Sequence, residues 1–405
     1  MSNRRARTVR DQYEVFPYPA RDPADEARRL QQTLGGNIDG INHFVFGGRR
    51  DFTKPFRVLV AGGGTGDALI YLAQQLADRR CPAEIVYLDL SEASRRIAES
   101  RAAARGLSVT FLTGSLLDVG SMGLGSFDYI DCSGVLHHLP VPEDGIAALA
   151  GVLAADGGMG LMLYGTAGRS GIYPVQEMLR TLAPADRPAA ERVALARRLL
   201  AALPPTHLLK RNPLLAVLPT DDAEIFDLYL HSQDRSYSVP ELATLTHGAG
   251  LRIAAFVPAA SYDPASYCAD KEILAPLATA TLVERAAFAE RLVSVLPMHV
   301  FYAVREANRV APPVAGDTAI PVWHDGFAFP AHDLGGTYRF GKNRGPVTAQ
   351  ITVTPEVAAI ARTIDGATPL ATIRERTGLR KSAFDDAWRA LWSLNGVHYL
   401  FLRQL

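Results

Sequence analysis

Between Arg57 and Gly165, short runs of aliphatic and β-branched residues alternate with stretches whose apolar residues recur at helical spacing. Leu69, Leu72 and Leu76 are three or four positions apart, which indicates a helix with one buried face. Strands that alternate with helices in this way favour a parallel sheet with helices on both faces, the doubly wound α/β fold. The runs that predict its first five strands are RVLVAGG, AEIVYLDLS, SVTFLTG, FDYIDCSG and MGLMLYG.

Beyond Gly165 the alternation stops. The next 75 or so residues read mostly as helix with proline breaks, and we expect them to cover the binding edge of the sheet. Two later apolar runs, LRIAAFVP and MHVFYAVRE, would complete a seven-stranded sheet before a linker rich in proline, alanine and glycine. Three short helical patterns and an apolar end then predict a winged-helix-like unit. The expected organisation is a lid segment (1–50), a core (51–165), a helical insertion (166–240), the completion of the core sheet (241–306) and a C-terminal accessory domain (307–405).

A glycine-rich turn follows the first strand. Gly62, Gly64 and Gly66 form the pattern G-x-G-x-G before a helix, where missing side chains let the backbone approach a ligand. Such a turn also allows a helix to pack closely on a strand, so the pattern alone does not establish a ligand-binding site. Asp89 ends the second strand about 20 residues later, where a carboxylate accepts from both ribose hydroxyls. Because Ser91 is available to cap the following helix, we favour ribose binding for Asp89.

Two ligand classes fit a glycine turn followed by such an acid, dinucleotides and S-adenosylmethionine. A dinucleotide turn runs G-x-G-x-x-G and places pyrophosphate at the helix N-terminus. Here Asp67 follows the third glycine, and we expect it to repel a diphosphate but to tolerate a zwitterionic methionine tail. Val60 and Ala61 occupy the positions where loops of this kind often carry a carboxylate. The ammonium group of the ligand therefore needs another partner, such as loop carbonyls or the end of the fourth strand.

Several motifs together resemble those of class I S-adenosylmethionine-dependent methyltransferases. They are VLVAGGGTGD, YLDLS, FDYIDCSGVLHHL and GGMGLMLYG, and the likeness extends more loosely to residue 306. The segments DQYEVFPYPARD and DLYLHSQDRSYSVPEL are similar to a bacterial branch of that family with a Tyr-Pro signature. The whole chain also resembles bacterial protein-lysine methyltransferases with a C-terminal winged helix. The resemblance implies a Rossmann-like seven-stranded fold, S-adenosylmethionine as methyl donor and S-adenosylhomocysteine as product.

The resemblance also implies which residues contact the cofactor. The glycine loop would line the methionine and ribose, Asp89 would bind the diol, and the segment after the third strand would border the adenine. Ser115 stands where many relatives have an aspartate for the adenine amino group. We expect residues 10–20 to fold over the cofactor as a lid; the alternative is a strap whose aromatic residues only anchor it to the core. The cofactor-binding residues implied are Tyr13, Tyr18, Ala61, Gly62, Gly63, Gly64, Gly66, Asp89, Leu90, Ser115, Leu116, Cys132 and Ser133.

Methyl transfer is an in-line displacement that needs alignment and, for a hydroxyl or a protonated amine, a base. His137 follows the fourth strand and is the first candidate, although a histidine pair there also serves capping and packing. Tyr164 ends the fifth strand, and Arg235 and Tyr237 lie in a polar turn, where a surface ion pair is the alternative. We assign these three to the acceptor side. The ten histidines show no H-x-x-x-H or paired-cysteine spacing, so we expect no metal.

The amino-acid composition limits which binding partners and which cellular compartment we expect. Lys and Arg together number 42 and so do Asp and Glu, which removes the simplest electrostatic argument for nucleic-acid binding. Three scattered cysteines fit a reduced, cytoplasmic setting. No apolar run approaches the roughly 18 residues that span a bilayer, so we expect no membrane partner.

These observations predict a methyltransferase but do not determine its methyl acceptor. The fourth strand lacks the Asn-Pro-Pro-Tyr type of signature found with planar amides and exocyclic amines, which favours an aliphatic amine, carboxylate, hydroxyl or carbon acid. A protein lysine is the first choice and a small metabolite the second. The alternative from another class is a non-catalytic, cofactor-binding regulator or scaffold. The C-terminal domain would bind a peptide or protein, hold a homodimer together or cap the core, with DNA binding last.

Overall fold

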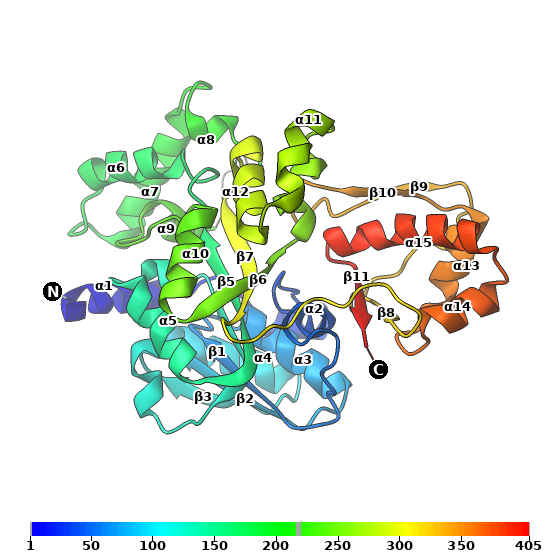
Figure 1. The fold of residues 1–405 in the computed structure, drawn as a ribbon. Helices are drawn as coiled ribbons and strands as arrows, with labels where there is room; N and C mark the ends of the chain where they lie inside the picture. Colours follow the sequence, from blue (N-terminus) through cyan, green and yellow to red (C-terminus); the bar gives the residue numbers. More distant parts are fainter. Residues whose placement is uncertain (1, 216–218, 220, 405) are drawn as a thin grey trace.

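The computed structural model describes residues 2–215, 219 and 221–404, and for residues 2–8 it describes the backbone alone. A central sheet lies between layers of helices, and the C-terminal residues form a separate group beside it (Figure 1). The strand order is β3-β2-β1-β4-β5-β7-β6. The strands are β1 (Phe56–Ala61), β2 (Ala83–Asp89), β3 (Thr110–Thr113), β4 (Phe127–Ser133), β5 (Leu153–Tyr164), β6 (Leu251–Val257) and β7 (Met298–Arg305).

The prediction of a doubly wound, seven-stranded α/β fold is confirmed, and the structure adds the directions of the strands. β1 to β5 are parallel, but β7 runs antiparallel to both β5 and β6, so the sheet is mixed. Antiparallel strands need no crossover from one end of the sheet to the other. Residues 258–297 can therefore leave β6 and enter β7 at the same edge.

Helices cover both faces of this sheet. Because side chains alternate along a strand, Val58 and Val60 of β1 face one layer while Leu59 and Ala61 face the other. The first layer contains α2 (Ile38–Val45), α3 (Asp67–Asp78) and α4 (Glu92–Ala104). The second contains α5 (Pro142–Gly151), α10 (Val239–Gly248) and α12 (Leu282–Val293). Short helices in the connections are η1 (Pro23–Ala27), η2 (Leu116–Ser121), η3 (Leu136–His138), η4 (Ala259–Tyr262), η5 (Pro264–Ser266), α11 (Lys271–Leu274) and η6 (Ala275–Thr279).

The segment after β5 folds into helices with an apolar core of their own. They are α6 (Ile172–Leu182), α7 (Ala189–Ala202), α8 (Leu208–Arg211) and α9 (Asp222–Tyr229). The N-terminal helix α1 (Ser2–Val15) lies beside this group in Figure 1. Phe16 stacks on Phe226 of α9 with ring centroids 5.1 Å apart, so the N-terminal segment is anchored to these helices.

The C-terminal residues form three helices and two small sheets around a third core. The helices are α13 (Pro355–Thr363), α14 (Leu370–Thr377) and α15 (Lys381–Gly396). β9 (Thr337–Phe340) pairs with β10 (Ala349–Thr352), and β8 (Ile320–Trp323) pairs with β11 (Leu400–Arg403), both antiparallel. The three predicted helices are present, while the winged-helix assignment stays a prediction. Within the described part of the chain, no helix has the length and apolar character to cross a bilayer.

Candidate active site

The glycine loop connects β1 to α3 and packs against the end of β4 and the N-terminal segment. Gly62 and Gly64 have left-handed backbone, with φ of 69° and 52°. A Cβ atom on Gly62 would lie 2.4 Å from a methyl carbon of Val135, and one on Gly64 would lie 2.7 Å from the backbone oxygen of Tyr18. Side chains at these two positions would displace the end of β4 or the N-terminal segment, so both places require glycine.

Asp89 lies directly beneath this loop. Its Oδ2 accepts from the Gly64 N–H at 2.8 Å, and its Oδ1 accepts from the Ser91 N–H at 2.8 Å. Ser91 caps α4 by accepting from Ser94 N–H, so capping is not the task of Asp89. Burial raises the pKa of Asp89, and the backbone N–H donors oppose that rise. Each carboxylate oxygen has a second lone pair available for a hydroxyl donor such as a ribose diol.

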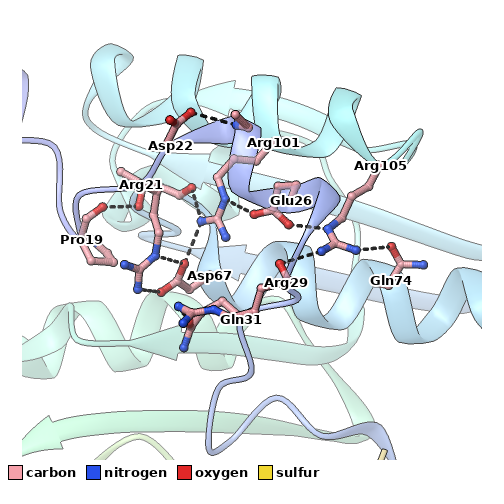
Figure 2. Close-up of polar contacts among 12 residues, drawn as sticks. Pro19, Arg21, Asp22, Glu26, Arg29, Gln31, Asp67, Gln74, Arg101 and Arg105 are labelled. Carbon is pink, nitrogen blue, oxygen red and sulfur yellow. Dashed lines mark hydrogen bonds and ion pairs between the residues drawn. The ribbon is translucent and has the colours of Figure 1, made fainter. Parts of the chain in front are cut away.

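An ion network fixes the start of α3 to the N-terminal segment (Figure 2). Asp67 pairs with Arg21 at 2.6 Å and with Arg101 at 2.8 Å. Burial alone would raise the pKa of Asp67, but these two guanidinium groups outweigh it and hold that pKa below its usual value. The expectation that Asp67 repels a diphosphate is therefore wrong, because its charge is already balanced within the protein.

The N-terminal segment crosses the carboxyl ends of β1 and β2. The Tyr18 carbonyl accepts from Thr65 N–H at 3.3 Å, and the Pro19 carbonyl accepts from the Thr65 hydroxyl at 2.7 Å. Farther back, the Tyr13 carbonyl accepts from the Ser91 hydroxyl at 3.2 Å. The segment thus lies against the glycine loop and the start of α4. Its action as a lid over a cofactor stays a prediction.

The Tyr13 hydroxyl lies in a buried polar cluster with Asp227 and His231. Asp227 of α9 accepts from Tyr13 at 2.9 Å and from the Tyr164 hydroxyl at 3.0 Å. Burial, and then the neighbouring Asp227 carboxylate, raise the pKa of Tyr164, so that phenol remains a donor. Sequence reasoning missed Asp227. Its closeness in sequence to His231, which lies two residues beyond the end of α9, is the signal that could have found it.

His137 lies in the same cluster, and its ring nitrogens are not hydrogen-bonded to any described residue. The residue is 0% exposed, and neither ring nitrogen has a hydrogen-bond partner among the described residues. Its ring stacks on Tyr164 at 3.8 Å, and the Arg169 guanidinium lies 3.5 Å from the centre of the same Tyr164 ring. Burial, then the nearby His138 and Arg169, lower the pKa of His137 well below its ordinary value. His137 is therefore neutral near pH 7, and its unprotonated ring nitrogen has a lone pair that no described residue uses.

Arg169 is held by a buried ion pair. It donates to Asp234 at 2.9 Å, and both side chains are almost fully enclosed. Gln176 of α6 donates to the same Asp234 oxygen at 3.1 Å. This contact joins Asp234 of the polar turn after α9 to the helical insertion, whereas Ser232 and Arg235 of the same turn are exposed.

His138, Asp227 and His231 bring three potential metal-ligand atoms within 4.8 Å of one another. The hydrogen bonds argue against a metal. His231 Nδ1 accepts from the Gln233 N–H at 3.0 Å, so the neutral ring carries its proton on Nε2, the atom that faces the cluster. The His138 and His231 rings also stack at 3.8 Å with an angle of 20°, which directs their nitrogen lone pairs side by side and not toward one centre.

Arg235 and Tyr237 lie outside this cluster. Their side chains line a surface pocket with Glu143 and Glu241, and the Arg235 guanidinium lies 4.6 Å from the centre of the Tyr237 ring. Only their backbones reach the site: Arg235 N–H donates to the His137 carbonyl at 3.2 Å, and Tyr237 N–H donates to the Tyr164 carbonyl at 2.8 Å. The structure therefore gives these two residues no side-chain contact with His137 or Tyr164.

The other predicted cofactor residues surround the carboxyl ends of the strands. The Ser115 hydroxyl caps η2 by accepting from Leu117 N–H at 3.2 Å, which leaves its own proton available. Cys132 faces the core away from the cluster, and burial raises its thiol pKa. Ala61, Gly63, Leu90, Leu116 and Ser133 lie along the same edge, with Ala61 and Leu116 buried, Gly63 and Leu90 half-buried and Ser133 exposed.

Residues 59–159 match the protein family described as a methyltransferase domain. The core of this chain is a methyltransferase domain. An uncharacterised protein of Synechococcus is 31% identical over 249 residues, which is 60% of this chain and 58% of that relative, less than two thirds of its length. Two structures of PKMT2 from Rickettsia typhi, one in complex with AdoHcy, resemble this chain with a TM-score of 0.65. They are 15% and 14% identical, and each match covers 92% of this chain and 76% of theirs. The solved structures therefore share the fold of most of this chain and not only that of the methyltransferase domain.

Proposed function

We propose that this protein transfers a methyl group from S-adenosylmethionine to an amine, with a protein lysine as the first choice of acceptor. The observation that carries the proposal is the Asp89 carboxylate held against the glycine loop, in a domain that also buries an unpartnered His137. The methyltransferase family match and the AdoHcy complex of the Rickettsia protein support the cofactor.

In this proposal Asp89 accepts from the ribose diol, and the glycine loop lets the backbone approach the adenosyl and methionine groups. Leu116 and Ser115 border the adenine. The bound sulfonium supplies an electrophilic methyl group. The chain's own task is to exclude water and to align the acceptor with that methyl group, which alone can supply several kcal/mol of the barrier reduction.

The charges of the buried cluster favour an amine acceptor. Asp227 is a carboxylate without a cationic partner among the described side chains, since its bonds come from two phenols. It would attract an ammonium group and repel a carboxylate acceptor. His137 would take the ammonium proton and leave the amine nitrogen with a free lone pair, ready for the methyl group that the bound sulfonium would supply. PKMT2, a protein lysine methyltransferase, supports lysine as acceptor.

A small metabolite is the second candidate acceptor, and the enclosure of the site favours it. His137, Tyr164, Asp227 and His231 are all buried beneath α1 and the helical insertion. A peptide lysine would have to enter past these helices. We therefore propose residues 166–240 as an acceptor lid and residues 307–405 as an accessory domain that binds the partner carrying the lysine.

Binding and transfer are tested separately. Calorimetry with S-adenosylhomocysteine should give saturable binding, and Asp89→Ala should weaken it by about 1–3 kcal/mol, the range for losing a charged hydrogen bond. Asp156→Ala, an exposed carboxylate at the opposite end of β5, is the matched control and should bind as the wild type does. Equal affinity of Asp89→Ala and wild type would reject the diol assignment.

Transfer is followed with a radiolabelled methyl donor and cell extract, with protein separated from small molecules. Label on protein lysine supports the first acceptor, and label in the small-molecule fraction supports the second. Tight cofactor binding with no label in either fraction would identify a cofactor-binding regulator and reject the enzyme.

A further inference from the structure

The row of paired strand residues beneath the glycine loop has no acid on β1 but has one on β4. Val60 on β1 stands where a carboxylate is common, and the register of the sheet pairs it with Asp131 on the neighbouring strand β4. Paired residues on adjacent parallel strands point to the same face and lie about 5 Å apart. A Cβ on Gly63 would lie 3.2 Å from a methyl carbon of Val60, so this row passes directly under the loop.

Asp131 has no charged partner among the described residues. The residue is 2% exposed, and its Oδ2 has no hydrogen-bond partner among the described residues. Burial raises the pKa of Asp131 to about 7, a hydrogen bond with Ser133 opposes the rise, and no described basic side chain acts on it. Tyr129 and Tyr302 are on the same face, but both donate their hydroxyls to the Gly35 carbonyl. A carboxyl group buried in this position needs a proton or a cation to offset the cost of burying its charge.

The row that contains Asp131 lies next to the carboxyl edge of the sheet. The β5 residue paired with Asp131 is Gly160, and the Tyr129 hydroxyl occupies the space where a side chain of Gly160 would lie. Two residues farther along β4, on the same face, Ser133 is exposed. One strand repeat of about 7 Å therefore separates the carboxyl group from the open end of β4.

We infer that Asp131 takes the place of the missing carboxylate of β1 and binds the ammonium group of the cofactor's methionine tail. This inference rests on the proposed function and names the partner for one end of its cofactor. The acid then lies on the neighbouring strand in the same row of paired residues, so the ammonium group would lie over β4 instead of β1.

The test compares two ligands that differ in the methionine tail. S-adenosylhomocysteine carries the ammonium group, whereas 5′-methylthioadenosine has the adenosine and the thioether but no amino-acid tail. Asp131→Asn should weaken S-adenosylhomocysteine about 10- to 100-fold, the range for losing a charged hydrogen bond, and should leave methylthioadenosine within about twofold. Asp128→Asn, on the same strand at its far end, should leave both affinities unchanged.

A swap of the acid supplies a second measurement. Val60→Asp combined with Asp131→Val returns the carboxylate to β1 and should restore most of the affinity for S-adenosylhomocysteine relative to Asp131→Val alone. Equal binding of S-adenosylhomocysteine by Asp131→Asn and wild type, or equal losses for both ligands, would overturn the inference while the cofactor assignment stands. Failure of the wild type to bind either ligand would instead reject the proposed function.

Discussion

His137 is the side chain whose state departs most from what folded proteins usually allow. Buried polar groups are nearly always hydrogen-bonded, yet both nitrogens of this fully buried ring are without a partner in the part of the chain that the structure describes. Stacking on Tyr164 holds the ring in place, and Arg169 on the same Tyr164 ring helps to keep it neutral. A neutral, oriented and unbonded imidazole is the form that a general base requires.

We therefore expect His137→Gln to lower kcat by about 10²- to 10⁴-fold, the usual contribution of a positioned base. The affinity for S-adenosylhomocysteine should change little, because His137 is assigned to the acceptor. His247→Gln, an exposed histidine at the end of α10, is the control. Steady-state kinetics and calorimetry measure the two effects, and a fully active His137→Gln variant would remove His137 from the mechanism.

At the scale of elements, one buried arginine joins three segments (Figure 2). Arg101 of α4 pairs with Glu26 of η1 at 2.6 Å and with Asp67 of α3, and it donates to the Thr65 carbonyl in the glycine loop at 2.9 Å. Arg105 also donates to Glu26. The network sets the position of the N-terminal segment relative to the loop, and its Arg101 side chain is only 1% exposed.

Removing that arginine should leave two carboxylates partly uncompensated. We expect Arg101→Met to lower the free energy of unfolding by about 3–5 kcal/mol, the cost of breaking a buried ion pair from one side. Arg96→Met on the same helix breaks an exposed pair with Glu92 and should cost about 0.5 kcal/mol or less. Urea unfolding gives both values, and hydrogen exchange should show faster exchange over residues 17–29 in Arg101→Met. Equal stability of the two variants would show that the network is not structural.

At the scale of the whole molecule, α2 connects the sheet to the C-terminal residues. His43 Nδ1 accepts from the Leu402 N–H at 3.1 Å, and Phe401 packs in the same core as α2 and β1. Burial lowers the pKa of His43 to about 4, and burial followed by the charge of Arg344 lowers that of His324 to about 3. Neutral histidines are thus part of the contact between the two parts of the chain.

Acid should weaken this contact. A histidine with a lowered folded pKa binds fewer protons than the unfolded chain, so its stabilisation is complete above the unfolded pKa of about 6.5 and falls as the pH drops toward 4. Each such histidine changes the free energy of unfolding by up to about 1.4 kcal/mol per pH unit. Asp131, whose pKa is raised to about 7, acts in the opposite direction and offsets one histidine.

Urea unfolding of the wild type at pH 7, 5.5 and 4.5 should show this loss. His43→Gln keeps an acceptor for Leu402 but cannot be protonated, so its stability should fall less steeply with acid. An identical pH slope in His43→Gln would assign the acid sensitivity to other groups.

The sequence by itself determined the strand and helix alternation, the glycine turn, the position of Asp89 at the end of the second strand and the three C-terminal helices, because periodicity and turn-forming residues act locally. Only the tertiary structure decided the antiparallel direction of β7, the neutralisation of Asp67 by Arg21 and Arg101, and the arrival of Asp227 beside Tyr164. It also separated the Arg235 and Tyr237 side chains from the site and placed Asp131 beside Val60. These features depend on strand register and on packing between segments far apart in the chain, and no local pattern encodes either.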